Sequence, residues 1–73
     1  MYDKSFYFKV EDMEYIREFL DSLIDRYIID SYDLTRGEDY CCLTCESEGL
    51  FKRYYYYFKC YEISFSLSCG VAF

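Results

Sequence analysis

The segment Asp12–Tyr27, DMEYIREFLDSLIDRY, decides the fold of this chain. At about 100° per residue, its apolar side chains fall on one continuous arc and its acidic side chains on the opposite arc. The apolar arc holds Met13, Ile16, Phe19, Leu20, Leu23, Ile24 and Tyr27. The opposite set, here called the acid row, holds Glu14, Glu18, Asp21 and Asp25. The pattern predicts an amphipathic helix that has Asp12 as its N-cap and ends near Tyr27.

The segments on either side of this helix are typical of β-strands. Ser5–Val10 alternates large side chains and precedes the helix directly. After the helix, residues 28–34 (IIDSYDL) predict an exit turn with a short strand, and Thr35–Asp39 predicts a polar turn centred on a glycine. Three further strands are expected at Tyr40–Ser47, Leu50–Cys60 and Glu62–Phe73. Glu48 and Gly49 would form a hairpin turn between the first two, and the join at Lys59–Glu62, which lacks turn residues, would be a hairpin or a bulge.

The apolar face of the helix has to be buried against another layer of secondary structure, and an antiparallel sheet can provide that layer. We therefore expect an α+β fold: a single small two-layer domain over residues 1–73. One amphipathic helix would pack on an antiparallel sheet of three to five strands in a βαβββ-like order.

Composition and charge narrow the classes of function. The chain has 73 residues and a formal charge of −6, which disfavours direct binding to nucleic acid or to an anionic membrane. An acidic surface fits a basic partner, or it serves solubility alone. The first residues lack the basic start and apolar run of a signal peptide, and no segment is long enough to span a bilayer. We therefore expect a cytoplasmic protein with reduced thiols.

Enzymatic chemistry finds no support in the sequence. The chain has no histidine, so it has neither a Ser-His nor a Cys-His pair. It also lacks a glycine-rich phosphate loop and a nucleophile elbow. We expect no catalytic residues and no cofactor.

The acid row is the first candidate binding feature. Its members are spaced four, three and four residues apart, which corresponds to rises of about 6, 4.5 and 6 Å along a helix. Such a row of carboxylates resembles the charge spacing of a nucleic-acid backbone, so a surface that grips phosphates could accept it. The alternative is a solvent-exposed face of an acidic protein. Further acids would extend the field if they share its side: Asp30, Asp33, Glu38, Asp39, Glu46 and Glu48.

The second candidate binding feature is the tyrosine-rich segment LFKRYYYYFKCYE, residues 50–62. As a strand it would pack one set of side chains on the helix and turn the other outward. The outward set would include Arg53, Tyr55, Tyr57 and Tyr61, and tyrosine and arginine are enriched at interface hot spots. This face would contact a protein partner or a second copy, or it would be an ordinary amphipathic surface. Stacking of nucleic-acid bases on the tyrosines between the basic residues is less favoured, because the net charge of the chain is negative.

The five cysteines are the third feature. Cys42 and Cys45 have the spacing of a metal knuckle, which Cys60 and Cys69 could complete. A strand, however, points Cys42 and Cys45 to opposite faces, and no second close pair exists. We expect buried cysteines that act as small apolar residues, and no metal site.

These features together predict a small acidic binding or inhibitor protein that acts as a DNA or RNA mimic. It would occupy the basic nucleic-acid-binding surface of a partner without binding nucleic acid itself. In size, acidity and lack of catalytic groups the chain resembles small phage-encoded antagonists of host defence, such as anti-CRISPR and anti-restriction proteins. That resemblance implies a host nuclease, methyltransferase or guided effector as partner. The alternative is a self-associating module, such as a homodimer, that uses an exposed tyrosine-rich sheet face.

Overall fold

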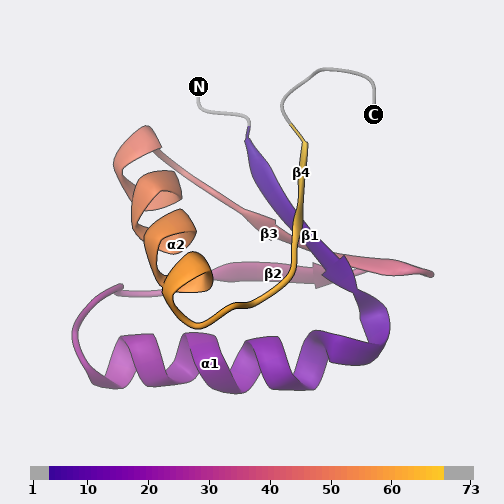
Figure 1. The fold of residues 1–73 in the computed structure, drawn as a ribbon, viewed down its shortest axis with the longest axis horizontal. Helices are drawn as coiled ribbons and strands as arrows, with labels where there is room; N and C mark the ends of the chain where they lie inside the picture. The colour runs from indigo at the N-terminus through magenta and orange to yellow at the C-terminus, as the bar shows by residue number, and fades with distance from the viewer. Residues whose placement is uncertain (1–3, 69–73) are drawn as a thin grey trace.

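The computed structural model describes residues 4–68. Its elements follow in the order β1 (Ser5–Lys9), the 3-10 helix η1 (Val10–Asp12), α1 (Met13–Asp25), β2 (Asp33–Arg36), β3 (Tyr40–Thr44), α2 (Glu48–Cys60) and β4 (Ser66–Ser68). The four strands of this part form one antiparallel sheet in the order β2-β3-β1-β4 (Figure 1). The prediction of a small α+β domain with an antiparallel sheet of three to five strands is confirmed.

The connections between strands form two interlocked βαβ units. Strands β1 and β2 are both antiparallel to β3, so they run parallel to each other with β3 between them. By the same argument β3 and β4 run parallel with β1 between them. Helix α1 connects the first pair and α2 the second, which is the split βαβ arrangement, βαββαβ. The expected βαβββ order is therefore corrected by one additional helix.

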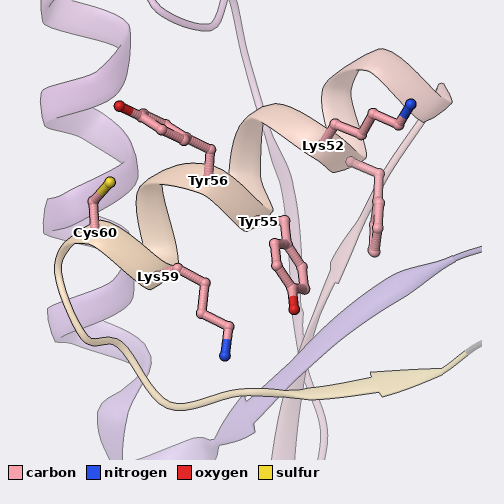
Figure 2. Close-up of a pocket in the computed structure, with 6 residues that line it drawn as sticks. Lys52, Tyr55, Tyr56, Lys59 and Cys60 are labelled. Carbon is pink, nitrogen blue, oxygen red and sulfur yellow. The ribbon is translucent and has the colours of Figure 1, made fainter.

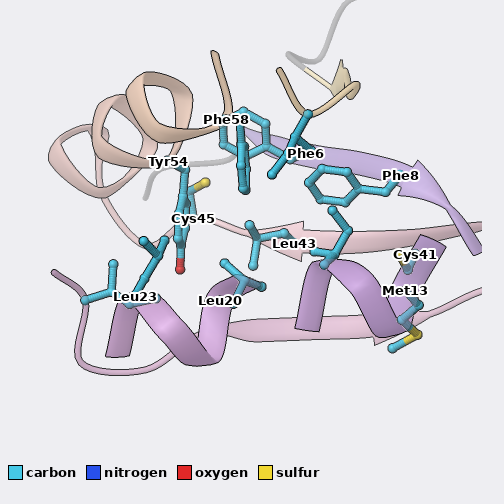
Figure 3. Close-up of a cluster of buried hydrophobic side chains, with 13 residues drawn as sticks. Phe6, Phe8, Met13, Leu20, Leu23, Cys41, Leu43, Cys45, Tyr54 and Phe58 are labelled. Carbon is cyan, nitrogen blue, oxygen red and sulfur yellow. The ribbon is translucent and has the colours of Figure 1, made fainter. Parts of the chain in front are cut away.

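The core lies between one face of the sheet and the two helices of the described residues (Figure 3). Side chains alternate along β1 and β3, and the inward positions Phe6, Phe8, Cys41 and Leu43 are buried. Phe6 is the centre of this layer, because its ring lies 4.9 Å from Phe51, 5.0 Å from Phe65 and 5.1 Å from Phe58. The edge-to-face pairs among these rings add to the stabilisation from area burial.

Helix α1 packs as the sequence predicts over most of its length. Met13, Ile16, Leu20 and Leu23 are buried, and the acid row is exposed. Asp12 occupies the N-cap position as predicted, although its side chain makes no capping hydrogen bond. The preceding 3-10 turn shapes the entry to the helix instead.

Tyr27 is not part of the apolar face. The helix ends at Asp25, and Tyr27 adopts a left-handed conformation with φ of 60° and is 95% exposed. The amide of Ile28 donates to the carbonyl of Leu23 at 2.9 Å, and the amide of Tyr27 donates to that of Ile24 at 3.0 Å. This pair of bonds is a Schellman motif, which satisfies the last carbonyls of the helix and turns the chain back toward the core.

The predicted strand Leu50–Cys60 is wrong, because these residues lie in the helix α2. Glu48 and Gly49, expected as a hairpin turn, are the first residues of that helix. Ser47 is its N-cap, and its hydroxyl accepts a hydrogen bond from the amide of Leu50 at 3.2 Å. Tyr54 and Phe58, four residues apart, are the buried residues of this helix.

The join at Lys59–Glu62 is a helix end rather than a bulge or a hairpin. Glu62 has φ of 58°, and the amide of Ile63 donates to the carbonyl of Phe58 at 2.8 Å. This is the same arrangement that ends α1, and here also an isoleucine follows the left-handed residue. Both helices therefore end in a Schellman motif whose left-handed position is not a glycine.

The remaining strands differ from expectation mainly in length. β3 ends at Thr44 rather than Ser47, and β2 includes Thr35 and Arg36, which were expected in the turn. Gly37 begins that turn, since its amide donates to the Tyr40 carbonyl at 2.8 Å and a Cβ there would lie 2.7 Å from the same oxygen. In the last segment, buried Ile63 and half-buried Phe65 and Leu67 alternate with exposed serines as predicted. The predicted continuation of this strand over residues 69–73 lies outside the described residues.

Candidate functional site

The acid row lies on the solvent side of α1, away from the sheet. Glu14, Glu18, Asp21 and Asp25 are all exposed. At about 100° per residue they fall within an arc of about 60°, and from first to last they extend about 16 Å along the axis. The structure thus places the four predicted carboxylates on one continuous surface.

Within residues 4–68 no lysine or arginine forms an ion pair with this row, although Arg17 flanks it three residues after Glu14 and four before Asp21. The ion pair found in that range joins Lys52 to Glu48 at 3.1 Å, on α2. Among the described residues, the side-chain hydrogen bond of this row is the one that Asp21 accepts from the hydroxyl of Tyr32 at 2.9 Å. Desolvation and this bond to Asp21 raise the pKa of Tyr32.

Two other segments bring further acids to α1. The amide of Val10 donates to the carbonyl of Asp39 at 3.0 Å, which places the Glu38–Asp39 turn at the start of the helix. The bond from Tyr32 to Asp21 brings the segment carrying Asp30 and Asp33 beside its second half. Glu46 and Glu48 instead lie at the start of α2, and Glu48 pairs with Lys52. Of the six additional acids considered from the sequence, Asp30, Glu38 and Asp39 therefore lie in segments next to α1, whereas Asp33 stands opposite Thr44, on the sheet face away from the helices.

Tyr15 is a feature of this surface that the sequence reasoning missed. It is 59% exposed, and it lies one residue after Glu14 and three before Glu18, at the edge of the acid row. Its signal was available, because Tyr15 falls outside the apolar arc of the helix and is aromatic. Tyrosine is among the residues enriched at interface hot spots, so this exposed ring is a candidate contact beside the carboxylates.

The predicted outward set of the tyrosine-rich segment does not form one face. Because the segment is helical, Arg53, Tyr57 and the C-cap residue Tyr61 project within an arc of about 80°, whereas Tyr55 lies on another side of α2. Arg53 donates to the carbonyl of Ile28 at 2.8 Å, and the ring of Tyr61 lies 5.1 Å from that of Phe19 on α1. Tyr57 is half-buried, whereas Tyr55 points the other way and lies 5.6 Å from Phe65. A binding role for these four residues stays a prediction, without the shared sheet face on which it was based.

Helix α2 instead presents a different outer face, defined here as Lys52, Tyr55, Tyr56, Lys59 and Cys60. These side chains line a shallow depression of about 430 Å³ together with Phe51 (Figure 2). Tyr56 is 62% exposed and Tyr55 is 38% exposed. The ammonium of Lys59 lies 5.6 Å from the centre of the Tyr55 ring and 5.9 Å from that of Phe65. The face is therefore aromatic at its centre and basic at both ends.

The cysteines are distributed rather than clustered. Cys41 and Cys45 are buried in the core, Cys42 lies half-buried on the opposite face of the sheet, and Cys60 is exposed on α2. Burial raises the pKa of Cys45 to about 12, which keeps that thiol neutral. Among the described residues, no three cysteine or acidic side chains come close enough to hold a metal ion. Cys69, the fourth ligand considered, lies outside the described range.

Fold and surface define a small split βαβ domain with an acidic helix face and a basic, aromatic helix face. Neither helix in residues 4–68 is long and apolar enough to cross a membrane. A scan against protein-family models and searches of curated proteins and of solved structures each found no match to this chain. Since one fold hosts many functions, the function has to be argued from these surfaces.

Proposed function

We propose that this protein is an acidic binding protein whose α1 surface occupies a basic, nucleic-acid-binding surface of another macromolecule. In this role it is an inhibitor that competes with nucleic acid, and the partner is a nucleic-acid-handling protein in the cytoplasm. One observation carries the proposal: four carboxylates share one arc of α1, and no ion pair within residues 4–68 involves them.

The absence of ion pairs to the acid row among the described residues is informative because the chain contains basic residues that make contacts elsewhere. Eight lysines and arginines accompany 14 acids. Arg26 donates to the hydroxyl of Tyr61, Arg53 to a backbone carbonyl, and Lys4 lies over the ring of Phe51. Acids four residues apart on a helix repel one another, so an unpaired row destabilises the free helix slightly. A cationic partner would relieve that repulsion, which favours binding and accelerates encounter at low ionic strength.

The row also has a defined shape. Its carboxylates lie on a rigid helix that is held by buried residues on its other side, and Tyr32 fixes the position of the Asp21 carboxylate. A preorganised row loses less conformational entropy on binding than flexible acids would. Tyr15 adds an exposed ring at the edge, which supplies contact area as well as charge.

The test is a pull-down with the purified chain at low and at high salt, followed by identification of the captured proteins. The variant Glu14→Lys/Glu18→Lys reverses half of the row and leaves the Tyr32–Asp21 bond intact. Its matched control, Glu46→Lys/Glu62→Lys, makes the same change in net charge at two exposed acids that are not part of α1.

We expect the native chain and the control to retain a nucleic-acid-handling protein at low salt and to lose it at high salt. We expect the row variant to retain at most about a tenth as much, since one or more charged contacts are reversed. Equal capture by the row variant and the native chain would refute the proposal. Equal loss in both variants would show that net charge, rather than the row, controls binding.

A further inference from the structure

The outer face of α2 has a chemistry that complements the acid row. Its centre is the exposed rings of Tyr55 and Tyr56, and its ends are the ammonium groups of Lys52 and Lys59 (Figure 2). We propose that this face binds the acid row of a second copy of the chain, so that copies associate head to tail. This inference rests on the proposed role of the row as a contact surface, but it requires no other partner.

The charges on the two helices match in spacing. Lys52 and Lys59 are seven residues apart, which is close to two helical turns and corresponds to a separation of about 10.5 Å along the axis. The acid row offers the same seven-residue spacing twice, between Glu14 and Asp21 and between Glu18 and Asp25. Two such helices laid side by side can therefore bring both ammonium groups against carboxylates at once.

Apolar contact is available between these charges. The depression on α2 is lined by the rings of Phe51, Tyr55 and Tyr56. Tyr15 projects from α1 at the edge of the acid row and is 59% exposed, so it can enter the depression while the neighbouring carboxylates reach its rim. Tyrosine is among the residues that contribute most to interfaces, because it buries a large ring and keeps a polar tip.

Within residues 4–68, the contacts of the charged groups on the two faces are weak ones. The pair between Lys52 and Glu48 is largely exposed on both sides, and such pairs contribute little and exchange readily. Lys59 lies over two aromatic rings at the surface and can turn toward a carboxylate with modest loss. The acid row makes no ion pair within residues 4–68.

The net charge sets the conditions for association. Each copy carries a formal charge of −6, so copies repel one another at a distance. At about 0.1 M salt the Debye length is about 10 Å, which screens this repulsion while contacts at short range persist. At about 1 M salt the length falls to about 3 Å and the contact pairs weaken as well. Association should therefore be strongest at intermediate ionic strength.

The contact uses two different surfaces, so it is heterologous and leaves a free face at each end of a dimer. Copies would form short open chains that grow with concentration. Within such chains each bound acid row is covered, so a basic partner competes with self-association for the same surface.

The experiment is analytical ultracentrifugation of the full chain, which has a mass of 9.0 kDa, over a range of concentrations at about 0.1 M and about 1 M salt. Three double variants accompany it. Glu14→Lys/Glu18→Lys alters the acid row, and Lys52→Glu/Lys59→Glu alters the α2 face. The control Lys9→Glu/Arg36→Glu makes the same change in net charge as the α2 variant, at exposed positions on the sheet.

We expect the native chain and the control to show a weight-average mass that rises with concentration at the lower salt and falls back at the higher. The row variant and the α2 variant should each lose at least tenfold in association constant. Mixed together, the two variants should form a dimer, because the α2 face that the row variant retains can bind the acid row that the α2 variant retains.

A native chain that stays monomeric at all concentrations and salts would overturn this inference. So would an equal loss in the sheet control, or a mixture of the two variants that stays monomeric. These outcomes leave the proposed function standing if the pull-down still depends on the row. If the row variant changes neither the pull-down nor the sedimentation, both proposals fail.

Discussion

Replacing Tyr27 by glycine should stabilise the protein, although it removes a large side chain. Tyr27 is the left-handed residue of the Schellman motif that ends α1, with φ of 60°. For a residue with a Cβ this conformation costs about 1–2 kcal/mol, and glycine adopts it without that strain. Glycine also has more freedom in the unfolded chain, which offsets about 0.5–1 kcal/mol of the gain. Because the tyrosine is 95% exposed, its removal forfeits almost no burial.

The net expectation for Tyr27→Gly is a gain of about 0.5–1 kcal/mol in the free energy of unfolding. For a domain of this size the melting temperature should rise by roughly 2–8 °C. Thermal unfolding followed by circular dichroism, together with urea unfolding, measures both quantities. The slope of the urea transition should stay unchanged, since the surface exposed on unfolding is nearly the same.

Tyr15→Gly is the matched control, because it makes the same chemical change at another exposed tyrosine. Tyr15 lies within α1, where glycine is less favourable than tyrosine by about 0.5 kcal/mol, and its partly buried ring would also be lost. We therefore expect opposite signs: stabilisation at position 27 and destabilisation at position 15. Destabilisation by both substitutions would refute the assignment of Tyr27 as the strained end of the helix.

Three further predictions concern two tyrosine hydroxyls and one buried thiol. The hydroxyl of Tyr54 is buried, and no hydrogen-bond partner within the described residues satisfies it. Tyr54→Phe should therefore raise the free energy of unfolding by about 1 kcal/mol. Tyr32→Phe, which removes the bond to Asp21, should lower it by about 0.5–1 kcal/mol. A loss of more than about 1 kcal/mol in Tyr54→Phe would show that the hydroxyl is bonded. The third prediction is a loss of stability at alkaline pH. Burial raises the pKa of Cys45 to about 12, whereas an unfolded thiol ionises near about 8.5. Above about pH 8.5 the folded state then holds more protons than the unfolded state, so stability falls as pH rises toward 12, and below that range this thiol contributes no pH dependence. Urea midpoints under reducing conditions at about pH 7 and pH 10 should show a smaller decrease for Cys45→Val than for the native chain, and equal decreases would contradict the reasoning.

The sequence predicts the first half of the fold well because its patterns are unambiguous there. The segment Asp12–Asp25 has one period and one apolar arc, and its buried residues are those expected from a helical projection. β1 is predicted to within one residue. The acid row follows directly from the helix, so its exposure and alignment were also predictable. The bonds from Val10 to Asp39 and from Tyr32 to Asp21, which gather further acids, involve distant segments that no local pattern reveals.

The sequence did not predict the helix α2, because a tyrosine-rich segment fits both the two-residue repeat of a strand and the 3.6-residue repeat of a helix. In residues 50–61 nearly every position is apolar or amphipathic, so alternation and a helical repeat are satisfied equally well, and tyrosine favours strands. Two local signals pointed to a helix. Ser47 precedes the run as an N-cap, with Glu48 in the first turn, and the run is longer than a typical strand. Tertiary packing decides between a strand and a helix, because in a helix Tyr54 and Phe58 can both contact Phe6 on β1.

The pairing of β1 with β4 has a consequence for how the chain reaches this structure. Ser5 lies opposite Ser68, so the central strand made first during synthesis acquires its last partner only after nearly all of the described chain has emerged. Until then β1 has one open edge, and the rings around Phe6 lack Phe65. Such long-range closure slows folding compared with a helical bundle of equal length. The pairing also places Ser5 and Ser68 side by side. A short linker joining these two positions, with a new chain break in the β2–β3 turn, should therefore give a circularly permuted protein of the same fold.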